Sequence, residues 1–360
     1  MGTVVMMNSL ALKVSFLFII YGILLTFEVK GFQIYWNVPT ENCQKYGINF
    51  ETLLTDLGIF HNAGGNFTGE KMRILYNPGL WPSLEHGKII NGGMPHHGNL
   101  TLHLDELEKY IEKNIPRNYT GLAVVDMESW RPVFRQNTGW MLVYRNLTQE
   151  EVQLENPSLA KALQDDPTNK RLMNELFHKA AKIFEPNAKE FMEMSLEKLK
   201  KWRPGTKWGY YGFPYCFNMY GNTNATRREM CPDIVQKENN VTKWLFQAYN
   251  HWFPSVYVPE ENFSVDERRQ LVQGRVKEFL RLKQMFNPRA NIYPYVWFTY
   301  NLKDNYLTEE DLKNTLSTLK KGKMDGAVIW GSSKNVNSQN LCQELRDYIN
   351  GTMRKVIEEY

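Results

Sequence analysis

The stretch of residues 121–137, GLAVVDMESWRPVFRQN, decides the fold. It begins with an uninterrupted apolar run at residues 122–125, which is typical of a strand buried on both faces of a parallel sheet. Two carboxylates, Asp126 and Glu128, follow at once. Residues two apart on a strand point to the same face, so both acids are expected at the carboxyl end of an inner strand. In (β/α) barrels, that end of the strands carries the catalytic residues.

The rest of the chain alternates strand-like and helix-like segments, as parallel strands joined by crossover helices do. Besides the run at 122–125, strands are predicted at residues 33–37, 72–76, 208–213, 255–258, 292–300 and 326–330. Helices are predicted at residues 50–60, 102–115, 266–285, 307–321 and 339–359, and a largely helical segment at 149–202 is interrupted by Pro157, Pro167 and Pro186. The expected fold is therefore α/β, a TIM-like (β/α) barrel of about seven parallel strands that forms one domain over residues 32–360.

Residues 1–31 read as a secretory signal peptide. Lys13 precedes an uncharged apolar run at residues 14–27, which is short for a membrane span. An uncleaved membrane anchor is the alternative. With a signal peptide removed, the protein is expected to be secreted, with no membrane association. A net charge of +4 shows no polyanion-binding tail, so no nucleic-acid partner is expected.

Glycosylation signals and cysteines agree with secretion. The chain has eight N-x-S/T sequons, at Asn66, Asn99, Asn118, Asn146, Asn224, Asn240, Asn262 and Asn350. Its four cysteines, Cys43, Cys216, Cys231 and Cys342, suggest two disulfides with three possible pairings. No metal site or cofactor is expected, because His96 and His97 are the only histidine pair and adjacent residues do not converge on one ion. We expect that pair to lie in a solvated loop.

The spacing of Asp126 and Glu128 limits the chemistry. A bare D-x-E is commonly two solvated acids, but here a buried run precedes it and Trp130 follows. Retaining glycosidases with a protein nucleophile hold two carboxylates about 5.5 Å apart across the anomeric carbon, which neighbours on one strand cannot do. Glu128 could instead protonate the leaving oxygen while the acetamido group of the substrate attacks. Asp126 would then orient that group, and its charge would raise the pKa of Glu128.

Aromatic and polar residues recur at the other predicted strand ends, which converge on one cavity in a barrel. These residues are Tyr76, Tyr211, Tyr257, Trp330 and Ser332. Each alone could be core packing, and the aromatic share of 13% suits a groove that stacks on sugar faces. Arg131 could bind substrate or hold the acids in place.

The chain resembles the animal hyaluronidases, glycoside hydrolase family 56, and in particular the insect venom and salivary members. The resemblance rests on YWNVPT (35–40), ILYNPG (74–79), VVDMESWRPVFRQN (124–137), WGYYGFPYC (208–216), PSVY (254–257), GRVKE (274–278) and VIWGSS (328–333). These stretches span almost the whole chain beyond residue 31. Met127 departs from the family, where Phe is common, and His96–His97 is unusual in its loop.

The resemblance implies a distorted (β/α) barrel and a retaining, substrate-assisted endo-β-N-acetylhexosaminidase. The expected substrate is hyaluronan, which would be cut at the β-1,4 bond after N-acetylglucosamine. Chondroitin would be cut more slowly. The protein is expected to be a monomer. Glu128 matches the proton donor and Asp126 its partner. The resemblance also implies a substrate pocket lined by Tyr76, Tyr211, Tyr257, Trp330 and Ser332, and the disulfides Cys43–Cys342 and Cys216–Cys231. A glycan-binding homologue with little activity and a chitinase-like hydrolase are the alternatives.

Overall fold

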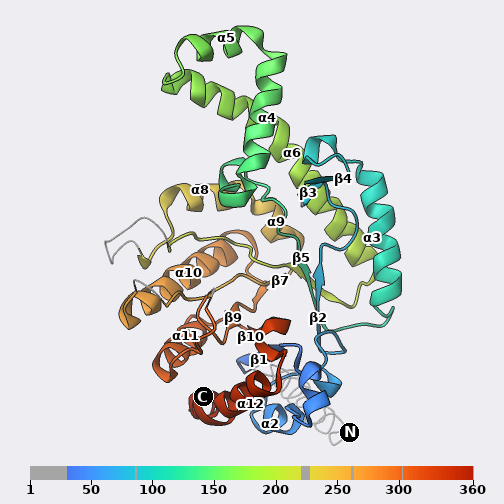
Figure 1. Cartoon of the computed structure of the whole chain (residues 1–360), viewed down its shortest axis with the longest axis vertical. Helices are drawn as coiled ribbons and strands as arrows, with labels where there is room; N and C mark the ends of the chain where they lie inside the picture. Colours follow the sequence, from blue (N-terminus) through green and yellow to red (C-terminus); the bar gives the residue numbers. More distant parts are fainter. Residues whose placement is uncertain (1–30, 86, 220–227, 261–262, 302, 360) are drawn as a thin grey trace, which may run out of the picture.

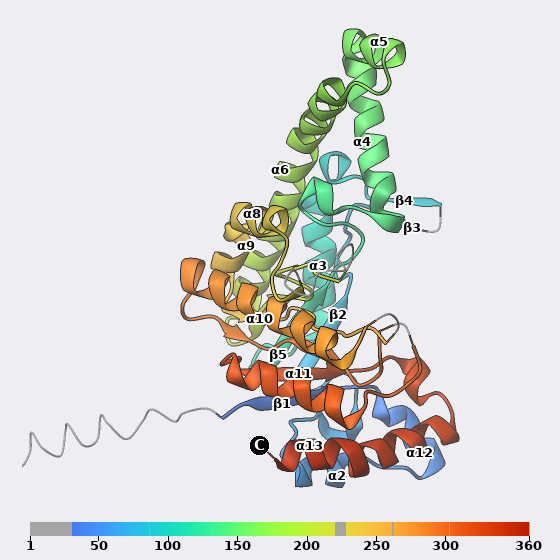
Figure 2. The same ribbon diagram turned by 90° about the vertical axis from the view of Figure 1, so that its left-hand side faces the viewer.

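The computed structural model describes residues 31–85, 87–219, 228–260, 263–301 and 303–359. The body consists of short parallel strands surrounded by helices, and a helical arm projects from one end (Figures 1 and 2). Most of the predicted signal peptide, residues 1–30, lies outside the described residues, so its boundary at residue 31 stays a prediction. Within the described residues, no helix is both long enough and apolar enough to span a membrane.

The central strands form two parallel sheets. One has the order β1-β10-β9 and the other β2-β5-β6. Their bounds are β1 (Gln33–Asn37), β2 (Met72–Tyr76), β5 (Leu122–Asp126), β6 (Lys207–Tyr210), β9 (Tyr295–Trp297) and β10 (Gly326–Trp330). The pair β7 (His251–Trp252) and β8 (Asn291–Ile292) lies between the sheets, and bridges Tyr211–Phe253 and Ser255–Tyr295 complete the connection. The strands thus run in the order β2, β5, β6, β7, β8 with β9, β10 and β1.

The resulting barrel is distorted and incompletely closed. Among the described residues no ladder joins β1 to β2, and a single bridge from Tyr35 to Phe60 lies on the free side of β1. The predicted α/β barrel with parallel strands is confirmed. The strand β5 is buried at every position, which explains why its sequence is an apolar run without alternation.

Three predicted strands are wrong in their bounds. The strand predicted at 208–213 is β6, which ends at Tyr210, and Tyr211 makes only an isolated bridge. The segment 255–258 is not a strand, because its ladder contacts with the neighbouring strand occur earlier, at His251–Trp252, and Ser255 makes only an isolated bridge. The segment 292–300 is divided into β8 and β9 by Tyr293-Pro294, since proline has no amide hydrogen to donate to a ladder.

The predicted helices are confirmed with shifts of a few residues at their ends. They are α2 (Glu51–Asp56), α3 (Leu100–Asn114), α10 (Val265–Phe286), α11 (Glu309–Lys321), α12 (Gln339–Tyr348) and α13 (Arg354–Glu358). Local capping fixes several starts: Ser264 and Glu267 form a capping box at α10, and Thr308 accepts a hydrogen bond from the Asp311 amide at α11. Not predicted were α8 (Asp233–Val241), α9 (Lys243–Ala248) and the hairpin of β3 (Ser83–Glu85) and β4 (Lys88–Ile90).

The projecting arm consists of α4 (Leu142–Glu155), α5 (Pro157–Asp165) and the first half of α6 (Lys170–Trp202) (Figure 2). Pro157 begins α5 and Pro167 lies between helices, as predicted, but Pro186 does not interrupt α6. An internal proline costs about 3 kcal/mol. The buried side chains of Phe184 and Ala188 flank it, and their packing offsets that cost.

Both disulfides have the pairings that the resemblance implied. Cys43 bonds to Cys342 and so ties the segment after β1 to α12, and Cys216 bonds to Cys231. The sequon asparagines that the structure describes are accessible to different degrees. Asn240 is partly buried and bonds to Arg281, Asn224 and Asn262 lie outside the described residues, and the exposed ones are Asn66, Asn99, Asn118, Asn146 and Asn350.

Candidate active site

Strand β5 places the two acids. Asp126 is its last residue, beside Tyr76 of β2 in the parallel register, and only 7% of it is exposed. The Asp126 carbonyl accepts a hydrogen bond of 2.8 Å from the Asn77 amide, which fixes the chain where the strand ends. Glu128 lies two residues beyond the strand, not on it as expected, and is exposed. The pair therefore combines a buried carboxyl group with an accessible one.

Burial controls the protonation of both acids. It raises the pKa of Asp126 well above its ordinary value, and the neighbouring Glu128 charge adds to that effect. The Glu128 side chain is open to the pockets, but the protein around its carboxyl group removes part of its hydration and raises its pKa, although the Arg131 charge works in the opposite direction. Because ionising one carboxyl group opposes ionising the other, the pair retains a proton at higher pH than free carboxylates do.

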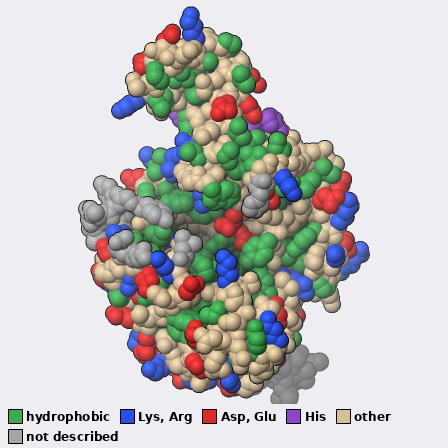
Figure 3. Space-filling model, in the orientation of Figure 1, with side chains coloured by type: hydrophobic (Ala, Val, Ile, Leu, Met, Phe, Trp, Pro, Cys, Tyr) green, Lys and Arg blue, Asp and Glu red, His purple; other side chains and the backbone are tan. Residues whose placement is uncertain are grey.

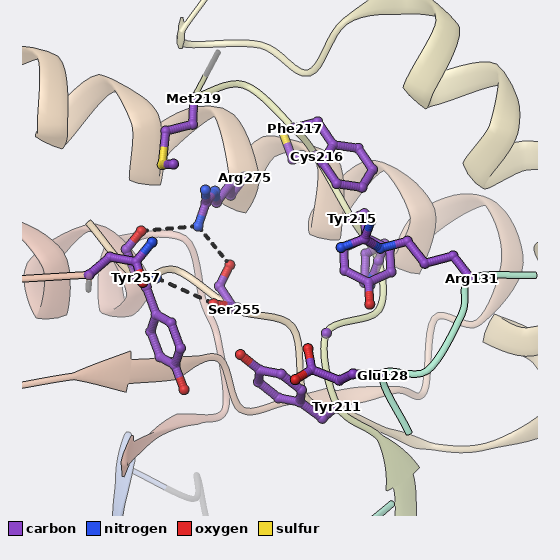
Figure 4. Close-up of a pocket in the computed structure, with 13 residues that line it drawn as sticks. Glu128, Arg131, Tyr211, Tyr215, Cys216, Phe217, Met219, Ser255, Tyr257 and Arg275 are labelled. Carbon is purple, nitrogen blue, oxygen red and sulfur yellow. Dashed lines mark hydrogen bonds between the residues drawn. The ribbon is translucent and has the colours of Figure 1, made fainter. Parts of the chain in front are cut away.

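One pocket opens on one side of Glu128. It has a volume of about 220 Å³ and lies against Arg131, Tyr211, Ser255 and Tyr257. In Figure 4 the Glu128 carboxylate points toward the Tyr211 side chain, with Ser255 and Tyr257 farther along the same cavity. Arg275 donates hydrogen bonds to the carbonyl oxygens of Ser255 and Tyr257, at 3.1 and 3.3 Å, and so supports that wall.

A second pocket, of about 390 Å³, opens on the other side of Glu128. Its lining includes Asn77, Glu85 and Trp140, and the Trp140 residue is 64% exposed. Glu128 is thus shared by two adjoining pockets. The face shown in Figure 3 is hollowed across its middle, with acidic side chains at the centre and hydrophobic ones around them. An elongated ligand could pass over Glu128 in both directions.

Aromatic rings form the wall next to Asp126. The rings of Tyr257 and Trp330 stack with centroids 6.0 Å apart, and the Trp330 indole donates a hydrogen bond of 3.3 Å to the Tyr76 hydroxyl. Burial raises the pKa of Tyr76 to about 12, so its hydroxyl stays protonated. Burial also raises the pKa of Tyr211 and that of Tyr257. Neutral hydroxyl groups therefore surround the acids.

Several buried polar atoms in this region have no hydrogen-bond partner, among them Oδ1 of Asp126, Nε of Arg131 and the hydroxyl of Tyr295. Tyr295 packs edge-on against Tyr211, with ring centroids 5.1 Å apart. Buried polar atoms are rarely left unpaired, and active sites are among the exceptions. The free carboxylate oxygen of Asp126 can accept a hydrogen bond from a ligand N–H.

Arg131 lies in the pocket wall next to Glu128. It lines the first pocket, and its charge lowers the pKa of Glu128. Its guanidinium lies over the rings of Tyr215 and Phe217, 4.7 and 5.1 Å from their centroids, and donates to the Gln136 carbonyl at 2.8 Å. These contacts hold a positive charge beside the acid.

Of the residues predicted for the site, Ser332 has a different environment. Its amide and hydroxyl both contact Oδ1 of Asn335, at 2.9 and 3.3 Å, and cap the 3₁₀ turn Ser333–Val336. No contact of Ser332 with Asp126, Glu128 or the site tyrosines is found in the part of the chain that the structure describes, and it lines neither pocket beside Glu128. The structure brings the other predicted residues together: Asp126, Glu128, Tyr76, Arg131, Tyr211, Tyr257 and Trp330.

Sequence reasoning missed Glu85, Trp140 and Tyr295. Glu85 ends a short hairpin strand, and Trp140 lies in a turn outside the predicted elements. An exposed tryptophan in an irregular segment is a usable signal for a sugar-stacking position. The expectation that His96 and His97 lie in a solvated loop is wrong for His96, whose side chain is only 7% exposed, whereas the His97 side chain is 50% exposed. Both rings approach Glu151.

Comparison with known proteins shows the family. Residues 24–359 match the family model described as hyaluronidase, Glyco_hydro_56. The chain belongs to the hyaluronidase family. It is 56% identical to the salivary hyaluronidase of Lutzomyia longipalpis over 340 residues, which cover 94% of this chain and 89% of that protein. The family is one of glycoside hydrolases, so an enzyme is indicated.

The fold agrees with that of a solved hyaluronidase. The crystal structure of bee venom hyaluronidase in complex with a hyaluronic acid tetramer matches with a TM-score of 0.81 and 37% identity, covering 91% of this chain and 98% of that one. The relatives also include an inactive hyaluronidase B from Vespula vulgaris, 34% identical over 327 residues, 89% of this chain and 91% of that protein.

Proposed function

We propose that this protein is an endo-β-N-acetylhexosaminidase that hydrolyses hyaluronan at the β-1,4 bond between N-acetylglucosamine and glucuronate. The observation that best supports this proposal is the position of Glu128, which lines two adjoining pockets. Beside it lies the buried Asp126, whose Oδ1 atom has no hydrogen-bond partner. An acid in the middle of a groove suits cleavage within a polymer. The similarity to a hyaluronidase solved with a hyaluronic acid tetramer supports this substrate. Chondroitin would be cut more slowly.

In the proposed first step, Glu128 gives its proton to the glycosidic oxygen. The bond from that oxygen to the anomeric carbon breaks, and glucuronate leaves as a hydroxyl group at its carbon 4. A general acid works well when its pKa lies near the working pH. The burial that raises the pKa of Glu128 moves it in that direction.

The electron pair for the same step comes from the substrate. The acetamido carbonyl oxygen attacks the anomeric carbon from within the same sugar and forms a cyclic oxazolinium ion. An intramolecular nucleophile has a high effective concentration. Among the described residues that line the two pockets, Glu85 is the second carboxylate, but it is exposed on a hairpin and accepts a hydrogen bond of 2.9 Å from Ser83. We therefore do not propose Glu85 as the nucleophile that attacks the anomeric carbon.

Asp126 is the proposed partner of the acetamido N–H. Accepting that hydrogen bond favours the ionised form of Asp126, since a bond to the charged form lowers a carboxyl pKa. The proton of the coupled pair is then left on Glu128, where the reaction needs it. The hydroxyl of Tyr211 or Tyr257 would hold the acetamido oxygen in line.

A water molecule completes the cycle. Glu128, now ionised, accepts a proton from that water molecule. At the same time the water oxygen attacks the anomeric carbon and opens the oxazolinium ring. The water enters on the face that the leaving group vacated, so two inversions give net retention. The products are a reducing N-acetylglucosamine end and a saturated glucuronate end.

The walls of the groove would bind neighbouring sugars. Trp140 offers an exposed ring on one side, and Tyr76 with Trp330 forms an aromatic wall near Asp126. Arg131 would attract a uronate carboxylate while it limits how far the pKa of Glu128 rises. Ser332 was also predicted to contact substrate, but its amide and hydroxyl bond to Asn335, so its proposed role is to fix the turn that follows β10.

Secretion as a monomer is part of the proposal. The apolar run at residues 14–27, the eight sequons and the two disulfides support an extracellular protein. The salivary relative supports the same compartment.

Product analysis on purified hyaluronan tests the proposal. The expected result is even-numbered oligosaccharides with N-acetylglucosamine at the reducing end and no unsaturated uronate. Binding of hyaluronan without the formation of new reducing ends would favour the glycan-binding alternative. The relatives include one protein of this kind, the inactive hyaluronidase B of Vespula vulgaris. Cleavage of chitin oligosaccharides in preference to hyaluronan would favour the chitinase-like alternative.

A further inference from the structure

A second cluster of functional side chains lies outside the groove. His96 and His97 belong to the 3₁₀ turn Pro95–His97, and Glu151 lies on α4, 55 residues later than His96. Nε2 of His96 is 2.7 Å and Nε2 of His97 is 3.6 Å from the same Glu151 oxygen, Oε2. One ligand atom from each of the three residues lies within 4.8 Å of the others. None of the three lines the pockets beside Glu128.

We propose that His96, His97 and Glu151 form a binding site for a divalent cation of the zinc class. Two imidazoles with one carboxylate are a recognised protein ligand set for Zn²⁺, with water in the fourth position. Mg²⁺ and Ca²⁺ prefer sites made of oxygen atoms alone, so they are disfavoured here.

The distances require only small adjustments. Tetrahedral bonds of 2.0–2.2 Å to the metal separate neighbouring ligand atoms by about 3.4 Å. The His97 contact of 3.6 Å is close to that value, and the His96 contact of 2.7 Å would lengthen by less than 1 Å. The His97 and Glu151 side chains are 50% and 32% exposed, so both can turn toward an ion.

The turn that carries the histidines is firmly built. A Cβ added at Gly92, where φ is +80°, would lie 2.3 Å from the His97 carbonyl oxygen, so the backbone can pack closely only with glycine there. The His96 ring packs against Phe184 of α6, with centroids 6.4 Å apart. Pre-positioned ligands lose less freedom when an ion binds.

Nε2 of His96 is the ring nitrogen that faces Glu151, so it is the atom that His96 offers to an ion. Its Nδ1 atom is buried without a partner. The charge of Glu155, one turn farther along α4, also acts on His96 and adds negative potential for a cation.

An ion at this position would connect the loop between β4 and α3 to α4, the first helix of the projecting arm. The arm begins at α4, directly after the turn that carries Trp140. The metal would thus stabilise the arm without taking part in catalysis. Its expected effect is on the stability of the arm and not on the bond-breaking step.

The test uses the full secreted chain without a histidine tag, stripped with a chelator and titrated calorimetrically with Zn²⁺ alone near pH 7.5. One Zn²⁺ per chain is expected, with a rise in the thermal midpoint. His97→Ala and Glu151→Gln should each weaken binding by at least about tenfold, since even partners that only orient ligands contribute 10- to 100-fold. His178→Ala, at an exposed histidine of α6 outside the cluster, is the matched control.

His97 and Glu151 are chosen because His96 is packed and its removal could unfold the turn. Circular dichroism of each variant checks the fold. Absence of Zn²⁺ binding to the wild type would overturn the site. Binding that the two variants retain as strongly as His178→Ala does would show that the ion is bound elsewhere and would equally overturn it. Co²⁺ should reproduce the stoichiometry with a tetrahedral absorption spectrum, and an octahedral spectrum would contradict the proposed geometry.

Discussion

The groove around Glu128 and the projecting arm differ in how far apart in the sequence their residues lie. The groove collects residues from β2, β5, the segment after β6, the segment after β7 and β10, so its members are far apart in the chain. The arm is formed by consecutive helices, α4, α5 and the first half of α6, and it leaves Leu154 and Met173 81% and 50% exposed. We expect changes in the groove to affect chemistry and changes in the arm to affect stability.

The largest effect is expected from Glu128→Gln. The amide keeps the shape of the side chain but has no proton to give to the leaving oxygen, and loss of general acid catalysis typically costs 10²–10⁴-fold. Turnover of hyaluronan should fall by that factor while polymer binding and the thermal midpoint stay near their wild-type values. Glu85→Gln is the companion variant and should keep most of its kcat. A comparable loss of kcat in Glu85→Gln would identify Glu85 as the missing nucleophile.

In the arm, Leu159→Ala should lower stability and leave turnover unchanged. Leu159 is the buried side chain of α5, and truncating a buried leucine costs about 2–5 kcal/mol of stability. Because the arm lies outside the groove, kcat per folded molecule should not change. Denaturant titration and a turnover assay on the same preparation measure both quantities. Lys161→Ala, at an exposed position of the same helix, is the control. A fall in kcat that parallels the fall in stability would break the distinction between the two regions.

A smaller effect is expected at the junction of the two regions. Trp140 lines the second pocket and directly precedes the residues that lead into α4. If its ring stacks on a sugar, Trp140→Ala should remove about 1 kcal/mol of binding, which is roughly a fivefold rise in KM. Trp140→Phe should recover much of the loss. An unchanged KM for long hyaluronan would remove Trp140 from the binding surface.

The smallest change is a shift of pH dependence in Arg131→Gln. Arg131 lowers the pKa of Glu128, because its positive charge favours the ionised acid. Removing the charge should raise that pKa, so the protonated acid persists to higher pH and the alkaline limb of kcat moves upward. Arg131→Lys keeps the charge and should leave the limb in place. Movement to lower pH would mean that Arg131 acts on the leaving group and not on the acid.

The sequence predicted the parts of the molecule where burial is continuous. β5 and β10 are buried at nearly all positions, and their apolar runs gave both their location and the place where side chains leave the core. The segment 255–258 could not be found in the same way. Its neighbouring ladder is two residues long, and Pro254 follows the Tyr211–Phe253 bridge. Such a short pairing has no periodicity to detect.

The candidate site was predicted where its residues lie at strand ends and missed where they lie in loops. Asp126 and Glu128 follow an apolar run, whereas Glu85 is on a hairpin that only three residues per strand define. The contact of His96 with Glu151 joins residues 55 apart through the packing of α4 on the body. No local pattern encodes such a contact. The sequence also could not show that Ser332 caps a turn, since Asn335 is identified as its partner only by geometry.

The account depends most on the claim that the acetamido group of the substrate is the nucleophile. The direct measurement compares hyaluronan that has been de-N-acetylated with the same polymer after re-N-acetylation, and proton NMR follows the first products. We predict that the re-acetylated polymer is cleaved to a β-configured N-acetylglucosamine end, while the de-acetylated polymer binds and is not cleaved. Efficient cleavage of the de-acetylated polymer, or an α-configured first product, would contradict the account and require a protein nucleophile or direct attack by water.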